Sequence, residues 1–194
     1  GFFQNLVANT TCHTCSIGMF AADISQDRCY DCPAGWQDNI EKTRCDACGK
    51  GLYQPNARAS ICIDCEDGKY AADLNMQYCT ACPAGWQDTD DKNRCDACPK
   101  GTYQKLQEQV ACNNCDAGSV SAELSSLTCQ NCLSGYYESL RIECKGCKKG
   151  AFQELNTGAT ECQTCPVGWF TSEERASSCD ICPQGWMEAG EQQS

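Results

Sequence analysis

The chain has 194 residues, 22 of them cysteine, and a formal net charge of −11 at pH 7. A high, even cysteine count is typical of disulfide scaffolds from oxidising compartments, so the sequence predicts a secreted or cell-surface protein. Acidic residues are spread along the chain, which argues against binding to nucleic acid or anionic lipid. The sequence contains no apolar run long enough to span a membrane, so we expect no direct membrane insertion of this stretch.

Residues 1–11 form an N-terminal lead-in before the first cysteine pair. The lead-in carries the conventional sequon Asn9-Thr10-Thr11, which makes Asn9 the glycosylation candidate.

From residue 12 onward the chain is a tandem repeat of short modules. Each of the eleven modules begins with a Cys-x-x-Cys pair, and Gly is the third residue after the pair. An aromatic residue follows that Gly within two positions in ten of the eleven modules. The first cysteines of the pairs are Cys12, Cys29, Cys45, Cys62, Cys79, Cys95, Cys112, Cys129, Cys144, Cys162 and Cys179.

Each part of the module indicates a small β-hairpin. The Gly suits a backbone position with positive φ or a crowded approach to a disulfide. The aromatic begins a short strand and is expected to cover a disulfide, and the polar remainder turns the chain back. We therefore predict a small disulfide-rich fold: an elongated tandem array of short β-hairpin modules with little helix and no single large core.

Three modules make a longer repeat of 50 residues. Residues 12–61 and 62–111 align without a gap over 50 positions and are about half identical. Residues 112–161 form a divergent third Cys-rich block, and 162–194 a truncated fourth. The sequence looks like a window on a longer array.

Spacing alone leaves the disulfide pattern open. In one scheme neighbouring pairs bond crosswise, which leaves one of the eleven pairs out; a mixture within each block is also possible. Uniform spacing favours linking the second cysteine of each pair to the first of the next, which leaves Cys12 and Cys182 to pair elsewhere. The preferred links are Cys15–Cys29, Cys32–Cys45, Cys48–Cys62, Cys65–Cys79, Cys82–Cys95, Cys98–Cys112, Cys115–Cys129, Cys132–Cys144, Cys147–Cys162 and Cys165–Cys179.

The segments Cys-Pro-Ala-Gly-Trp and Cys-Pro-Lys-Gly-Thr-Tyr, with pairs about 17 residues apart, resemble ephrin-receptor-like cysteine-rich repeats. They also resemble modules of tumour-necrosis-factor-receptor ectodomains and Cys-x-x-Cys arrays of protist surface proteins. The resemblance runs from Cys12 to Trp186 and implies extracellular, disulfide-linked β-modules stacked end to end. This chain lacks the closely spaced cysteine triplets of the receptor modules.

Chemically active alternatives are weaker. Paired Cys-x-x-Cys motifs approach the spacing of four-cysteine zinc sites, but eleven pairs would leave one over, so zinc is a remote alternative. Redox catalysis would need a helix start, and His13, the only histidine, has no evident nucleophile. The acidic run Asp88, Asp90, Asp91 and Asp96 lacks the spacing of a calcium loop. A binding stripe of Trp36, Trp86, Trp169 and Trp186 is less favoured than disulfide cover.

We therefore predict a non-enzymatic extracellular rod, such as a stalk, coat or filament segment of a larger protein, without cofactor or metal. The alternative is a ligand-binding or adhesive ectodomain of a cell-surface receptor. The expected partners are proteins, including further copies of the chain, with Phe2, Phe3, Leu6 and Val7 as candidate contacts.

Overall fold

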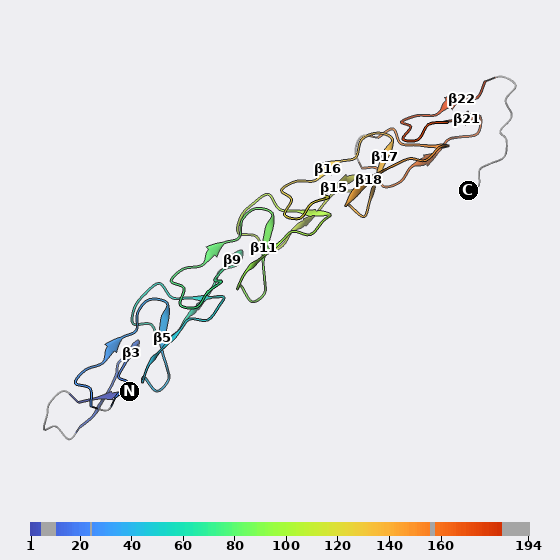
Figure 1. The fold of residues 1–194 in the computed structure, drawn as a ribbon. Coiled ribbons are helices and arrows are strands. Elements are labelled where there is room, and N and C mark those ends of the chain that lie inside the picture. The colour runs from blue at the N-terminus through green and yellow to red at the C-terminus, as the bar shows by residue number, and fades with distance from the viewer. Residues whose placement is uncertain (5–10, 24, 156–157, 184–194) are drawn as a thin grey trace. The chain divides into compact units, whose positions relative to one another are not determined.

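The computed structural model describes residues 1–4, 11–23, 25–155 and 158–183. These residues contain eleven two-stranded antiparallel hairpins and no helix, which confirms the predicted small disulfide-rich fold of tandem β-modules (Figure 1). Within the same ranges we find no helix with the length and hydrophobicity of a membrane span.

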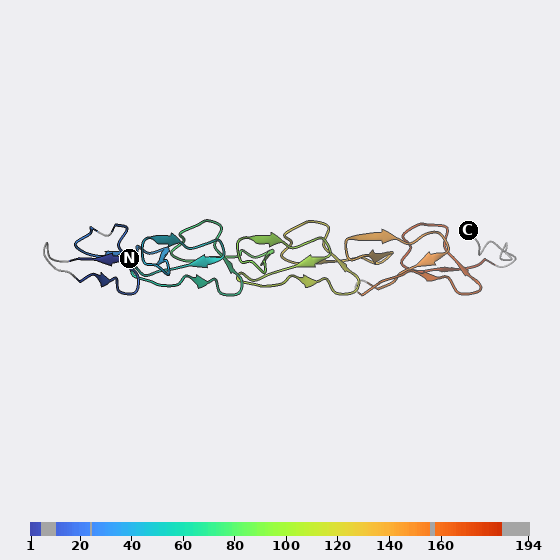
Figure 2. The same cartoon turned by 90° about the horizontal axis from the view of Figure 1, so that it is seen from below.

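The chain divides into two compact units. The first comprises Gly1–Ala97 and Leu106–Ala111, and the second comprises Cys98–Lys105 and Cys112–Ser194. In Figure 2, the hairpins of the first unit follow one another in chain order, from blue to green.

The first unit contains six hairpins. Its paired strands are β1 (Phe2–Phe3) with β2 (His13–Thr14), β3 (Met19–Phe20) with β4 (Tyr30–Asp31), β5 (Trp36–Asp38) with β6 (Cys45–Ala47), β7 (Leu52–Tyr53) with β8 (Ile63–Asp64), β9 (Lys69–Tyr70) with β10 (Thr80–Ala81), and β11 (Trp86–Asp88) with β12 (Cys95–Ala97).

The second unit contains five hairpins. Its paired strands are β13 (Thr102–Tyr103) with β14 (Asn113–Asn114), β15 (Ser119–Val120) with β16 (Gln130–Asn131), β17 (Tyr136–Ser139) with β18 (Glu143–Gly146), β19 (Ala151–Phe152) with β20 (Gln163–Thr164), and β21 (Trp169–Phe170) with β22 (Asp180–Ile181).

Ten of the eleven described hairpins start directly after a repeated glycine, and β1 starts directly after Gly1. Gly35, for example, has φ of +84°, and the Trp36 N–H donates to the Pro33 carbonyl at 3.1 Å, which closes a tight turn. A positive φ at the third position of such a turn is the conformation that Gly adopts most easily. The first strand follows at once. The second strand includes the two residues inside the next Cys-x-x-Cys pair, as Asp46 and Ala47 do in β6.

Disulfide-bonded cysteines make up most of the buried interior. The second cysteine of nine successive pairs, from Cys15 to Cys147, is at most 2% exposed, whereas the aromatic residues of the described ranges are half-buried or exposed. Disulfides and small alanines such as Ala21 and Ala71 therefore take the buried positions, and the aromatic residues lie nearer the surface.

Candidate functional site: the junction between disulfide loops

A disulfide closes each module into a loop, and neighbouring loops are joined by backbone hydrogen bonds. The third residue after nine of the repeated glycines, and after Gly1, donates its N–H to a carbonyl in the following loop. Asp38 donates to Ala59 at 3.2 Å and Gln54 donates to Met76 at 3.0 Å. The same bond recurs from Gln4, Ala21, Ala71, Asp88, Gln104, Ser121, Glu138 and Gln153. Because each loop completes the hydrogen bonding of its neighbour, the loops of one unit are structurally interdependent.

The side chain at this donor position explains the period of three modules. It is small in the first module of each block (Ala21, Ala71, Ser121, Thr171), acidic in the second (Asp38, Asp88, Glu138) and Gln in the third (Gln54, Gln104, Gln153). In the second block the small and glutamine positions are buried, Ala71 at 0% and Gln104 at 4% exposed, whereas the acidic Asp88 is half-buried. Three different side chains at this position therefore accompany three different neighbouring loops.

The glutamine side chains at the donor position form hydrogen bonds with backbone groups of their own loop. Gln54 Nε2 donates to the Ile61 carbonyl at 2.7 Å, and Gln54 Oε1 accepts from the Asn56 N–H at 3.1 Å. Gln153 bonds Glu161 and Leu155 in the same way, at 2.7 and 3.1 Å. The sequence analysis did not identify these residues. The recurrence of an aromatic residue followed by Gln in the third module of each block was the available signal.

The repeated glycines also receive a close contact from two loops further along the chain. A Cβ added at Gly18 would lie 1.9 Å from the Arg58 carbonyl oxygen, and one added at Gly68 would lie 2.1 Å from the Glu108 carbonyl. Both pairs are 40 residues apart in sequence. These positions therefore require glycine for two reasons: the positive φ of the turn and the close approach of another backbone segment.

The approaching residue has a left-handed conformation in most loops. Arg58 has φ of +62° and Glu108 of +59°. Their N–H groups donate to the carbonyls of the buried Cys32 and Cys82, at 2.8 and 2.9 Å. Each such contact therefore satisfies a polar group that a buried disulfide would otherwise leave without a partner.

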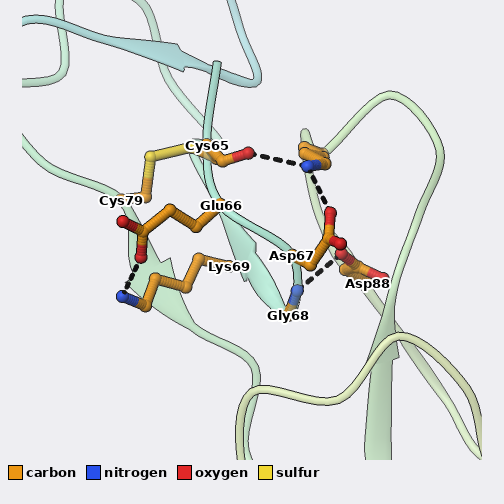
Figure 3. The surroundings of a disulfide bond; sticks show 8 residues. Cys65, Glu66, Asp67, Gly68, Lys69, Cys79 and Asp88 are labelled. Carbon is orange, nitrogen blue, oxygen red and sulfur yellow. Dashed lines mark hydrogen bonds and ion pairs between the residues drawn. A yellow bond between two sulfur atoms is a disulfide. The ribbon is translucent and has the colours of Figure 1, made fainter. Parts of the chain in front are cut away.

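Charged groups reinforce the junction around Cys65–Cys79 (Figure 3). Lys92 Nζ donates to the Cys65 carbonyl at 2.8 Å and to Asp67 Oδ1 at 2.7 Å. The hydrogen bond that Lys92 donates to the Asp67 carboxylate raises the pKa of Lys92. The Gly68 N–H donates to Asp88 Oδ2 at 2.7 Å, so the acidic residue of the second module replaces the carbonyl that accepts from Gly elsewhere, such as Gln54 O from Gly35.

An exposed ion pair lies beside this junction. Lys69 Nζ and Glu66 Oε2 are 2.7 Å apart, and this hydrogen bond lowers the pKa of Glu66 and raises that of Lys69 (Figure 3). The first block has an equivalent lysine contact, in which Lys42 Nζ donates to the Cys15 carbonyl at 2.7 Å.

The structure brings the cysteines together in the consecutive arrangement. Ten disulfides join the second cysteine of one pair to the first of the next, with Cα–Cα distances from 5.5 Å at Cys132–Cys144 to 5.9 Å at Cys165–Cys179. Cys12 and Cys182 are free thiols.

The remaining candidate residues from the sequence analysis lie apart from these junction contacts or outside the described residues. His13 is exposed in β2, with its ring 5.7 Å from that of Phe3. Trp36, Trp86 and Trp169 begin the corresponding strands β5, β11 and β21. Asn9, Leu6, Val7 and Trp186 lie outside the described residues.

The acidic run between 88 and 96 is divided among separate interactions. Asp88 bonds the Gly68 N–H, and Asp96 Oδ1 accepts from Arg94 Nε at 2.9 Å. Over the described ranges, no group of three or more His, Cys, Asp or Glu side chains is arranged to hold a metal ion.

Two grooves occupy equivalent positions in the first two blocks. One, of about 590 Å³, is lined by Phe2, Ile40 and Lys42 among others. The other, of about 310 Å³, has Leu52, Asp90 and Lys92 at the positions 50 residues later. Charged residues line both grooves, but the apolar Ile40 of the first is replaced by Asp90 in the second. The backbone therefore repeats while the surface chemistry changes.

A family model described as tyrosine-protein kinase ephrin type A/B receptor-like matches residues 135–182 and 154–191. This part of the chain is ephrin-receptor-like. The ephrin-receptor-like segment has the same glycine turn, cystine link and inter-loop bond as the rest, for example at Gly135, Cys147–Cys162 and Glu138. No curated protein matches the chain.

Proposed function

We propose that the chain is a spacer segment of an extracellular, non-enzymatic ectodomain. The observation that carries the proposal is the N–H to carbonyl bond that recurs from one disulfide loop to the next. It makes each loop depend on its neighbour, so the array resists local opening while its surface remains free to vary. The ephrin-receptor-like match and the ten disulfides support an oxidising, extracellular location.

The chemistry of the junctions agrees with a structural role. Their strongest polar contacts, such as Lys92 with the Cys65 carbonyl, connect parts of the chain to each other. The free energy of the fold is expected to come mainly from cross-links: closing a loop of about 15 residues contributes on the order of 3 kcal/mol in the chain-entropy model.

Small-angle X-ray scattering tests the spacer proposal. If each module advances about 10 Å, eleven modules span on the order of 110 Å, and such a rod has a radius of gyration of about 32 Å. A compact protein of this length would have about 16 Å. A value near the compact one in dilute, monomeric samples would refute the proposal.

A ligand-binding ectodomain is the second candidate function. The receptor-like description of the matched family and the different lining of the two equivalent grooves favour it. In that case one block would bind a protein that the others do not, because the residues that differ between blocks would form the contact. Binding of a partner that is lost on exchanging Ile40 for the equivalent Asp, but kept on exchanging Leu140, would support this candidate.

Self-association is the third property to measure. Sedimentation equilibrium under oxidising conditions distinguishes a monomer from an array of copies, and a Cys12→Ser/Cys182→Ser variant separates disulfide-linked copies from those that associate without cross-links.

A further inference from the structure

The turn that joins β17 to β18 differs from the equivalent turns of the first two blocks. The disulfide loop that contains it, Cys132–Cys144, has a sequence separation of 12, whereas Cys32–Cys45 and Cys82–Cys95 have 13. Strands β17 and β18 have four residues each, and the equivalent strands have three. The third block therefore joins longer strands by a shorter turn.

The shorter turn places Leu140 in an unfavourable backbone conformation. The Ile142 N–H donates to the Ser139 carbonyl at 3.0 Å, and the two residues between them, Leu140 and Arg141, have φ of +54° and +60°. Turns with two such residues usually contain Gly, Asn or Asp. Leu140 is the only large apolar residue with a positive φ in the ranges that the structure describes, and it is 84% exposed. Such strained and exposed residues are often found where a protein makes a contact.

Hydrogen bonds hold this turn in place. The Arg141 N–H donates to Glu138 Oε2 at 2.6 Å, and the Arg141 carbonyl accepts from the Ser121 N–H at 2.9 Å. The Arg141 side chain is exposed and takes part in none of the ion pairs among the described residues. The turn therefore offers a leucine and a guanidinium group at adjacent positions, on a backbone that needs little further ordering to bind.

The groove of about 590 Å³ in the first block has a complementary apolar surface. Its lining includes Ala22, Phe2, which is 51% exposed, and Ile40, which is fully exposed. Pockets of about 300–1,000 Å³ hold molecules larger than one side chain, so the groove has room for a leucine. A leucine in this groove would remove apolar surface of both partners from water.

Carboxylates in the lining of the same groove complement the arginine. Asp23 and Glu41 are exposed, and neither belongs to an ion pair of the described residues. Lys42 also lines the groove, but its ammonium group donates to the Cys15 carbonyl at 2.7 Å. The groove therefore combines an apolar surface with two carboxylates that can pair with a cation.

The equivalent groove of the second block has a different lining. Asp90 stands where the first groove has Ile40, and Asp64 stands where it has Thr14. A leucine placed beside these carboxylates would remove them from water without supplying a hydrogen bond. The second groove is therefore a poor site for the same turn.

We propose that copies of this chain bind each other through these two surfaces. Leu140 of one copy enters the groove beside Ile40 of another copy, and Arg141 pairs with Asp23 and Glu41. Both surfaces are small, so the contact is weak and transient. Each copy carries one such turn and one such groove, so a bound copy can bind a further one.

This contact would be the basis of the self-association that sedimentation measures, and it does not rest on the spacer function. Because the scattering test of the spacer function uses monomeric samples, either proposal can fail while the other stands.

Sedimentation equilibrium of the full oxidised chain tests the contact, with Cys12→Ser/Cys182→Ser as the parent so that no copies are disulfide-linked. We expect the mean mass of the parent to rise with concentration up to about 1 mM. Leu140→Asp should weaken the association at least about tenfold. Asp tolerates a left-handed backbone better than Leu, so the turn itself should be kept. Ile40→Asp, which reproduces Asp90 of the second block, should weaken the association to the same extent.

Two exposed residues outside both surfaces provide matched controls. Leu133 and Ile61 are each 69% exposed, and the third block has Glu161 at the position of Ile61. Leu133→Asp and Ile61→Glu should associate as the parent does. A thiol titration that finds no free cysteine in any variant controls for correct oxidation.

Mixing the two defective variants tests whether the turn of one copy binds the groove of another. Leu140→Asp keeps the groove and Ile40→Asp keeps the turn, so an equimolar mixture should form heterodimers and nothing larger, at a concentration where each variant alone is monomeric. Arg141→Glu should weaken the association of the parent at low salt, because the new carboxylate faces the two carboxylates of the groove. A parent that stays monomeric up to about 1 mM, an equal loss in Leu133→Asp and Leu140→Asp, or a mixture that stays monomeric would overturn the proposal.

Discussion

Replacing Gly68 by alanine tests whether the contact between loops, and not the turn alone, requires glycine. The new Cβ would lie 2.1 Å from both the carbonyl carbon and the carbonyl oxygen of Glu108, and it would sit on a backbone with φ of +77°. A left-handed L-residue costs about 1–2 kcal/mol. Displacing the Glu108 loop adds about 1–3 kcal/mol of overpacking, including the weakening of its bond to the Cys82 carbonyl.

The expected total is therefore about 2–5 kcal/mol. Gly168→Ala is the matched control, because Gly168 has φ of +84° but none of the described residues lies within 4 Å of its added Cβ. That variant should lose only the conformational part, about 1–2 kcal/mol.

Hydrogen exchange measured by mass spectrometry reports both effects locally. Gly68→Ala should reduce the protection of peptides covering residues 106–111 by roughly one and a half to three and a half orders of magnitude. Gly168→Ala should reduce protection around its own turn by about one order of magnitude. Equal losses in the two variants would refute the contribution of the inter-loop contact.

Three further predictions concern the junction, the cross-links and the charges. Gln54→Ala should destabilise the first unit by about 1–3 kcal/mol in a denaturant titration with the disulfides intact, because the buried carbonyl and amide that Gln54 bonds lose their partners; Gln54→Met, of similar volume, should not restore the loss. Peptide mapping without reductant should yield the ten consecutive links and two alkylated thiols, Cys12 and Cys182, whereas crosswise links would contradict the loop structure. The hydrogen bond from Lys69 lowers the pKa of Glu66 from its ordinary value of 4.5. The ion pair therefore stabilises the folded protein above that pH, and its contribution is lost as the pH falls through the lowered pKa. The small difference in denaturation midpoint between the wild type and Glu66→Gln should disappear in acid.

The lysine hydrogen bonds to cysteine carbonyls differ between blocks, although the backbone hydrogen bonds between loops recur. Lys42 and Lys92 bond the carbonyls of Cys15 and Cys65, but the third block has Ile142 at the corresponding position. The backbone hydrogen bond is nevertheless retained, because the Ser121 N–H donates to the Arg141 carbonyl at 2.9 Å. The lysine side chains therefore add hydrogen bonds to junctions that backbone hydrogen bonds already hold together.

The sequence by itself predicted the hairpin class of the fold because cysteine and glycine act locally. A Cys-x-x-Cys pair followed by Gly fixes a turn within a few residues, and the structure has the predicted positive φ at Gly18 and Gly35. The 50-residue block was also visible, since the third module repeats an aromatic residue followed by Gln, as at Tyr53-Gln54 and Tyr103-Gln104.

Only the tertiary structure decided which loops lie together in the period of three modules and which repeated glycines, such as Gly18, are approached by a second backbone. Gly18 and Arg58 are 40 residues apart, and no local pattern connects a glycine turn to a left-handed arginine two loops later. The burial of Gln54 and the bond from Gly68 to Asp88 likewise depend on which loop lies alongside. Turn conformation is set by neighbours in sequence, whereas these contacts are set by the stacking of closed loops, and that is why the sequence determined the module and the tertiary structure determined the junction.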